Sequence, residues 1–209
     1  MIALPVFIDL RAKAPAIVAQ QVGLNSCTAH SICAAAYHAM QVAGDSAPLH
    51  FSALFLYYNA RYAEKALLFQ EKACGFGMKG EPVKIVDGLR SITQIGLCPD
   101  YAWPYKPERY NQRPSDEAYQ LGYHQRNWKY SALPPRLDAL KQCLADGHPF
   151  IFGSLIYQSF QSASVAQSGH IPYPNSYDRQ IGAHAMLAVG YDDGQRHFIV
   201  RNSFGEDWG

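Results

Sequence analysis

Helical periodicity fills the first half of this chain, and β-strand patterns follow it. Apolar residues recur at helical spacing from Cys27 to Ala43, and two more helical patterns precede a tyrosine-rich stretch that contains three prolines. A short helix then begins at Pro135 and ends at Gly147. We expect helices over residues 27–43, 51–68, 83–96 and 134–147, and strands over 149–157, 184–191 and 197–204. Because the helices come first and the strands later, the sequence predicts an α+β fold with segregated lobes.

The composition indicates a globular protein of one domain or two small lobes. The 209 residues are 48% hydrophobic and 17% charged, which suits a sizeable core. A net charge of +1 gives no reason to expect a nucleic acid or an anionic membrane surface as partner. The apolar runs are too short for a membrane span, and the N-terminal residues do not resemble a signal peptide. Either a cytoplasmic or a secreted location fits these features.

The sequence offers no cofactor or metal site that we would expect to be occupied. The segment GFGMKG, residues 75–80, matches the G-x-G-x-x-G pattern of dinucleotide sites but lacks their strand–turn–helix context, so we expect a loop. His30 and His38 share a predicted helix with Cys27, without the spacing or the fourth ligand of a zinc site. No C-x-x-C pair is present, and we expect most or all of the five cysteines to be free thiols: Cys27, Cys33, Cys74, Cys98 and Cys143.

One cysteine lies where a helix is predicted to begin. Asn25 and Ser26 are good N-cap residues and directly precede Cys27. Free N–H groups and the helix dipole at this end stabilise an anion, so the position favours a low thiol pKa and a nucleophile. The alternative is a buried structural cysteine, because free cysteine is usually buried. The position alone does not decide between the two.

The last two predicted strands bring a histidine and an asparagine within reach of each other. They flank the turn DDGQR, and with Asp193 as its centre His184 lies nine residues before it and Asn202 nine residues after it. Directly opposed residues of an antiparallel pair have Cβ atoms about 5 Å apart, so the two side chains should form a hydrogen bond. A bulge or a one-residue slip would put them on opposite faces of the hairpin.

These residue types fit a single mechanism. A thiol nucleophile needs a base near neutral pH, which His184 supplies, and Asn202 can fix the tautomer and orientation of that imidazole. Gln21, six residues before Cys27, carries an amide that can donate to a developing oxyanion, and the Cys27 backbone N–H is a second donor. We therefore predict a Cys27–His184–Asn202 site with Gln21 in the oxyanion hole.

With these residues in this order, the chain resembles the papain-like cysteine proteases, and bacterial members in particular. The resemblance rests on QVGLNSC, GAHAMLAVGYDDGQRHFIVRNSFGEDWG, and the intervening FSALFLYYNAR, WPY and GHPFIFGSLIYQSF, and spans nearly the whole chain. It implies a single catalytic domain over residues 1–209, with a helical lobe over about residues 16–105. A β-barrel-like antiparallel lobe would comprise about residues 106–209 with residues 1–15. A peptide or protein substrate would lie in the cleft between the lobes.

Several positions depart from the family pattern without removing a reacting group. Thr28 and Asn25 replace the usual Trp and Gly beside the nucleophile, and Leu24 replaces a cysteine that forms a disulfide in many secreted members. Phe204 replaces a Trp, and Ala183 replaces the Gly before the histidine. We expect these changes to alter substrate fit more than chemistry.

The resemblance leaves two alternatives to an endopeptidase open. One is a papain-fold binding module that has lost turnover, and the other is a transamidase or ligase in which an amine resolves the acyl-enzyme. No prosegment is visible before Cys27, so either the prosegment is missing from this sequence or control comes by another route, such as a protein inhibitor. We expect a monomer. Because the family continues past the final DWG, we also expect the chain to be part of a longer protein whose next strand covers residues 197–204.

Overall fold

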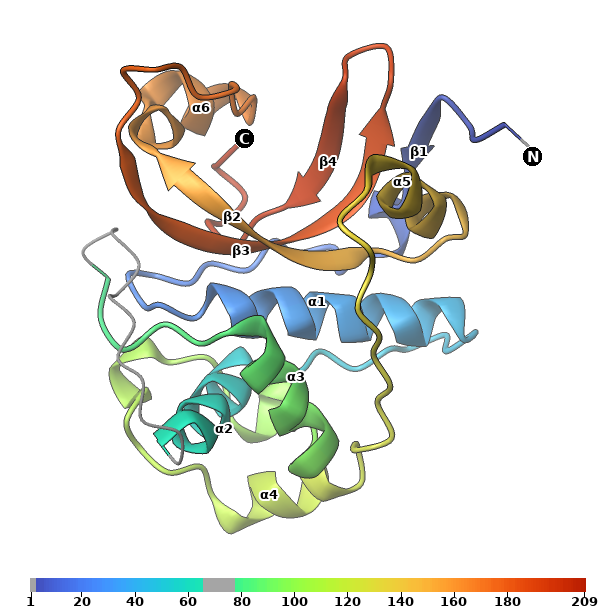
Figure 1. Ribbon diagram of the computed structural model, residues 1–209. Helices are drawn as coiled ribbons and strands as arrows, with labels where there is room; N and C mark the ends of the chain where they lie inside the picture. Colours follow the sequence, from blue (N-terminus) through green and yellow to red (C-terminus); the bar gives the residue numbers. More distant parts are fainter. Residues whose placement is uncertain (1–2, 66–77) are drawn as a thin grey trace.

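The structure is a computed structural model that describes residues 3–65 and 78–209. Figure 1 shows a curved β-sheet, the long helix α1 against it, and the shorter helices α2, α3 and α4 on the far side of α1. The described helices are α1 (Cys27–Val42), α2 (Ala53–Lys65), α3 (Ile85–Gln94), α4 (Asp116–Tyr123), α5 (Leu137–Ala145) and α6 (Ala163–Ser168). The strands are β1 (Phe7–Asp9), β2 (Phe150–Tyr157), β3 (Gln180–Asp192) and β4 (His197–Arg201). The α+β class is confirmed.

Most expected elements are present within a few residues of their expected ends. The helix predicted from Cys27 ends at Val42, and Gly44 follows with a φ of 89°, the left-handed conformation that favours glycine. The last three residues of the helix predicted over 51–68, and residues 75–77 of GFGMKG, lie outside the described residues. The short elements β1, α4 and α6 were not expected.

The long strand β3 organises the sheet because the other three described strands all pair with it, each antiparallel. β2 pairs with the first two thirds of β3, whereas β1 and β4 pair near its end. Since β3 is the shared partner, the described strands form an open, curved sheet, visible in Figure 1, and do not close into a ring. The β-barrel-like lobe expected from the sequence is corrected accordingly.

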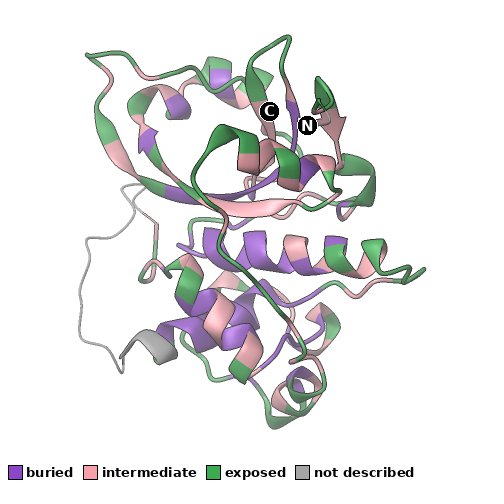
Figure 2. Cartoon of the chain, turned by 45° about the vertical axis from the view of Figure 1, so that its right-hand side comes forward, coloured by how far each residue is buried: buried purple, intermediate pink, exposed green. Residues whose placement is uncertain are grey.

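Two apolar surfaces sandwich α1, as the buried positions in Figure 2 indicate. On one side lies the helical core, in which Leu54, Phe55, Leu56 and Tyr57 of α2 are fully buried. On the other side lies β3, whose residues 184–191 are all buried. Burial on both sides holds the N-terminal end of α1 against the middle of the sheet, and this contact builds the site described below.

The segment after the tyrosine-rich stretch packs on the helical core. Ala118 of α4 is fully buried in that core, and the rings of Tyr119 and Trp128 pack against it. The lobe boundary expected near residue 105 stays a prediction, and this packing favours a boundary later in the chain.

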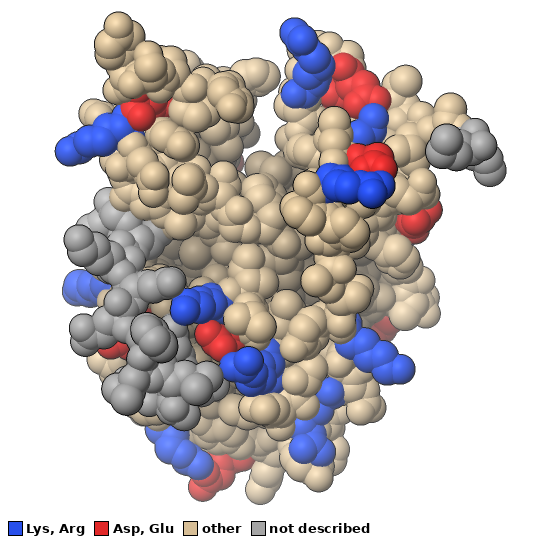
Figure 3. Space-filling model, in the orientation of Figure 1, with Lys and Arg blue, Asp and Glu red and all other residues tan. Residues whose placement is uncertain are grey.

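The surface shows no gathering of one sign of charge on the face drawn in Figure 3, where basic and acidic side chains are scattered among uncharged ones. None of the helices in the described residues is long and apolar enough to cross a membrane. Cys27, Cys33, Cys98 and Cys143 are free thiols, as expected, and Cys74 lies outside the described residues.

Candidate active site

The first residue of α1 carries the predicted nucleophile. Cys27 is 9% exposed, and the backbone N–H of Ala185 in β3 interacts with its thiol, so the helix start touches the residue that follows His184. Ser26 is the N-cap residue, but its side chain does not cap the helix; its hydroxyl shares a 2.6 Å hydrogen bond with the Tyr105 hydroxyl. Cys27 therefore lies at the start of the helix, as predicted, but the Ser26 side chain does not cap that helix.

The thiol pKa runs against the expectation from the helix dipole. Burial raises the pKa of Cys27 above its ordinary value, and N–H donors from Ala185 and Thr28 offset only part of that rise. Desolvation penalises the thiolate more than the helix terminus stabilises it. Burial therefore acts against the low thiol pKa that the helix terminus predicts, and that low pKa stays a prediction.

His184 and Asn202 form the predicted hydrogen bond, with 2.8 Å between His184 Nε2 and Asn202 Oδ1. The backbone N–H of Ser203 donates to the same Oδ1 at 2.8 Å, which identifies that atom as the amide oxygen. Nε2 must therefore carry the proton in this bond, and Nδ1 is the basic nitrogen of the neutral ring. The tautomer of His184 is fixed by its partner.

The register that produces this pair differs from the one predicted. β3 and β4 pair Asp192 with His197, and a bulge around Val189 then shifts the pairing so that Leu187 lies opposite Arg201. Asn202 follows the end of β4 and is diagonal to His184, not directly opposed to it. The predicted register was wrong by two residues, an even shift that keeps both side chains on one face.

Aromatic rings cover the imidazole. The His184 ring centroid lies 5.0 Å from that of Phe204 and 6.0 Å from that of Phe160, and Trp208 packs on both phenylalanines. His184 is only 3% exposed, and burial lowers its pKa, while the bond to Asn202 acts in the opposite direction. Burial therefore favours the neutral form of the imidazole.

Gln21 is buried and its amide is fully engaged. Its Nε2 donates to the Leu24 carbonyl at 2.8 Å and to Met78 Sδ at 3.1 Å, while its Oε1 accepts from the Ser203 hydroxyl at 2.7 Å. The Gln21 backbone N–H donates to the Ser203 carbonyl at 2.9 Å, and Gln20 forms an isolated bridge with Phe204. The residue after Asn202 thus fixes both the backbone and the amide orientation of Gln21.

The sequence did not point to Ser203, Met78 or Tyr105 as parts of this region. Tyr105 donates to the Gln21 carbonyl at 2.9 Å, from a stretch interpreted only as an irregular boundary. Met78 belongs to GFGMKG, a segment notable in the sequence for its glycines. For Ser203 a signal did exist, because a residue adjacent to the predicted Asn202 must lie near the site.

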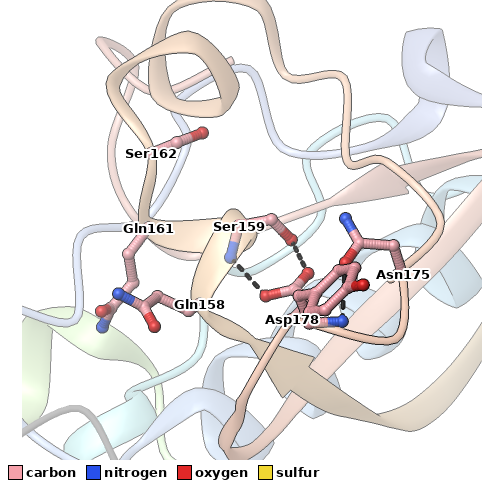
Figure 4. A pocket seen from close by; sticks show the side chains of 7 residues that line it. Gln158, Ser159, Gln161, Ser162, Asn175 and Asp178 are labelled. Carbon is pink, nitrogen blue, oxygen red and sulfur yellow. Dashed lines mark hydrogen bonds between the residues drawn. The ribbon is translucent and has the colours of Figure 1, made fainter.

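A polar hollow lies at the 3₁₀ turn that also carries Phe160, whose ring packs against His184. It has a volume of about 620 Å³, and Figure 4 shows its lining from the 3₁₀ turn Gln158–Gln161 and from Asn175 and Asp178. The backbone N–H and the hydroxyl of Ser159 both donate hydrogen bonds to the Asp178 carboxylate. We assign this hollow no chemical role. Within the described residues, no group of three or more His, Cys, Asp or Glu side chains could hold a metal ion.

Comparisons with known proteins bear on the family and the fold of this chain. A sequence profile described as "Papain family cysteine protease" matches residues 4–209. An uncharacterized peptidase C1-like protein of Acanthamoeba polyphaga mimivirus is 32% identical over 195 residues; the match covers 89% of this chain but only 59% of that relative. The crystal structure of xylellain, a cysteine protease from Xylella fastidiosa, matches with a TM-score of 0.81 and 32% identity, covering 99% of this chain and 77% of that one.

A more distant structure shares the fold alone. Digestive procathepsin L 3 of the Tenebrio molitor larval midgut matches with a TM-score of 0.68 at 20% identity, covering 99% of this chain and 62% of that one. Together these likenesses confirm the papain-like fold that the resemblance implied, apart from the open sheet.

Proposed function

The chain belongs to the papain family of cysteine proteases, and on that premise we propose that it is an endopeptidase in which Cys27 forms an acyl-enzyme with the substrate. Peptides or proteins are the substrates that such a family implies. The observation that carries the proposal is the 2.8 Å hydrogen bond between His184 Nε2 and Asn202 Oδ1, with its donor and acceptor assigned by Ser203.

The proposed reaction follows from that tautomer. His184 Nδ1 takes the proton of the Cys27 thiol as the sulfur attacks the substrate carbonyl carbon, and then gives that proton to the leaving amine. A water molecule, deprotonated by the same nitrogen, hydrolyses the thioester. Asn202 transfers no proton; it keeps the proton on Nε2, so that Nδ1 stays available as the base.

Burial of both groups bears on when the proton moves. Burial raises the pKa of the thiol and lowers that of the imidazole, so it favours the neutral form of each group. We infer that proton transfer accompanies attack on the carbonyl, and that the tetrahedral oxyanion is stabilised by Gln21 Nε2 and the Cys27 backbone N–H. This oxyanion hole is part of the proposal.

The test is reaction with a peptidyl epoxide that alkylates thiols, followed by peptide mapping. Cys143 is the matched control, because its thiol is more exposed than that of Cys27 and its pKa is also raised by burial. Labelling of Cys27 ahead of Cys143, abolished by His184→Ala, supports the proposal. Faster labelling of Cys143, the more exposed thiol, contradicts the proposal and favours the alternative of an inactive binding module.

Steady-state kinetics of site variants rank the proposed roles. Cys27→Ala should abolish hydrolysis and His184→Ala should come close to that, whereas Asn202→Ala should be milder because it only orients the base. Gln21→Ala should lower kcat by about 10²–10³-fold, the usual loss for one oxyanion donor. If Asn202→Ala and Gln21→Ala both leave kcat unchanged, the roles assigned to them are wrong.

Hydrolysis and acyl transfer differ in what resolves the acyl-enzyme. Product analysis in the presence of a millimolar amine nucleophile separates them: the proposed endopeptidase gives the free acid as main product. A predominant amide product would assign the chain to the transamidase or ligase alternative.

A further inference from the structure

A methionine sulfur lies on the proposed oxyanion donor. Gln21 Nε2 carries two hydrogens, and its two acceptors are the Leu24 carbonyl at 2.8 Å and Met78 Sδ at 3.1 Å. The thioether is the weaker of the two acceptors, so we take the hydrogen directed at Met78 as the one that is exchanged for a substrate oxygen.

The backbone around Met78 is tied to the loop that precedes Cys27. The Lys79 N–H donates to the Gly23 carbonyl at 2.7 Å, and the Asn25 N–H donates to the Lys79 carbonyl at 3.0 Å. The Asn25 side chain donates to the Gly80 carbonyl at 2.6 Å and more weakly to the Met78 carbonyl at 3.4 Å. These bonds hold the Met78 side chain beside Gln21.

A thioether is a weak acceptor, which suits this position. In the resting enzyme it satisfies a buried N–H, and its bond is readily given up when a negatively charged oxygen forms nearby. A strong acceptor at the same place would compete with the oxyanion for that hydrogen, because it would stabilise the ground state through a bond that has to be broken to reach the transition state.

We propose that Met78 is a modification site through which peroxide-class oxidants lower turnover. One hydrogen peroxide molecule transfers an oxygen to the Met78 sulfide: the sulfur loses two electrons and forms the S=O bond, the O–O bond breaks, and water leaves. Three rotatable bonds let the side chain withdraw so that the sulfoxide oxygen accepts from Gln21 Nε2. The inference rests on the proposed role of Gln21 as oxyanion donor.

The setting of Met78 favours oxidation there over oxidation at Met186. Met78 is half-buried, whereas Met186 is 4% exposed within β3. Met40 in α1 is also half-buried but packs against the helical core. Met40 therefore serves as a control of similar exposure away from Gln21.

The experiment must separate methionine oxidation from oxidation of Cys27. The thiols are first blocked with methyl methanethiosulfonate, the protein is treated with hydrogen peroxide, and dithiothreitol then restores the thiols but not the sulfide. We expect the kcat of the wild type to fall by about tenfold or more, and by no more than in Gln21→Ala. Methionine sulfoxide reductase should restore it.

Two variants make the assignment specific, each compared with its own untreated sample. Met78→Leu should keep its kcat after treatment, whereas Met40→Leu should lose it as the wild type does. Unchanged wild-type kcat with Met78 shown by mass spectrometry to be oxidised would overturn the inference, as would equal losses in Met78→Leu and wild type. If Gln21→Ala itself leaves kcat unchanged, the failure belongs to the proposed oxyanion hole instead.

Discussion

Burial moves the pKa values of the two proposed reacting groups in opposite directions. It raises that of the Cys27 thiol and lowers that of the His184 imidazole, because each charged form loses hydration. The helix terminus and the Asn202 hydrogen bond counter these shifts without cancelling them. Burial therefore favours a neutral thiol and a neutral imidazole.

The pH dependence of activity follows from these directions. The base is lost when His184 binds a proton, so kcat/KM should fall as the pH drops through a midpoint below the ordinary histidine value of about 6.5. Alkylation of Cys27 by iodoacetamide should rise with pH toward and beyond the ordinary thiol range, since the thiolate forms late. A flat alkylation rate between about pH 5 and 8 would instead reveal a preformed thiolate–imidazolium pair.

Ser203 should act on turnover through Gln21. Its hydroxyl donates to Gln21 Oε1 at 2.7 Å in a buried setting, and its loss leaves that oxygen unsatisfied and the amide free to rotate. We expect Ser203→Ala to lower kcat about tenfold, corresponding to about 1.4 kcal/mol, with a smaller effect on KM. Ser168→Ala, which removes an exposed hydroxyl bond within α6, is the control. Equal kcat in both variants would contradict the positioning role.

At the scale of elements, the β3–β4 hairpin decides which residues meet. The pairing near the turn, Asp192 with His197, would by itself place Asn202 on the face opposite to His184. The bulge around Val189 adds one residue to β3 and restores a common face. The two strands and their rough limits could be predicted from alternation and turn residues. The bulge could not, although Gly190 within an apolar run is the kind of signal that marks one.

The elements missed from the sequence have different causes. α4 carried usable signals, because Ser115 caps it by accepting from the Ala118 N–H, and Asp116 and Glu117 occupy its first turn. The prolines before α4 are typical of an irregular stretch, and the prediction followed them instead of the helix signals. β1 has only three residues, and its strand conformation comes from pairing with β3, a long-range contact that no local pattern encodes.

Two strand glycines provide a matched test of this packing. A Cβ on Gly190 would lie 2.2 Å from the Ile8 carbonyl oxygen and 3.1 Å from Asp9 Cα, so β1 would have to move. A Cβ on Gly153 would meet only Ile85 Cδ1, at 3.8 Å. Gly190→Ala should cost about 1–3 kcal/mol of unfolding free energy, and Gly153→Ala should be neutral or stabilise by up to about 1 kcal/mol. Urea denaturation measures both, and equal effects would contradict the close approach of β1 to Gly190.

At the scale of the whole molecule, the layers around α1 enclose neutral histidines. His30 and His38 on α1 and His184 on β3 are all buried, and burial lowers the pKa of each. For His30 the pKa falls to about 4. The unfolded chain therefore binds more protons than the folded one between the folded and unfolded pKa values, and folding is weakened by acid in that window.

Acid should accordingly destabilise the protein before its carboxylates titrate. Stability from His30 is fully present above about pH 6.5 and is lost as the pH falls toward 4, a loss of about 3 kcal/mol in that range. Urea denaturation at about pH 7 and pH 5 measures the slope. His30→Phe should reduce the slope of stability against pH while it keeps the ring contact with Tyr105. His124→Gln, at an exposed position, is the control and should leave that slope unchanged. An unchanged slope in His30→Phe would refute the assignment.

The hydrogen bonds between Gln21 and Ser203 also determine when this part of the site can form during synthesis of the chain. The two residues lie 182 positions apart, so at elongation rates of about 5–20 residues per second roughly 10–40 s separate their appearance on the ribosome. The helical layer around α1 and α2 can fold during that interval. Gln21 cannot yet form its bonds to Ser203, because Ser203 has not been synthesised. The Cys27 thiol of a nascent chain therefore passes through that interval without an oriented Gln21 amide and without the His184 imidazole. The candidate site therefore forms late, after there has been time to complete the helical layer on which it is built.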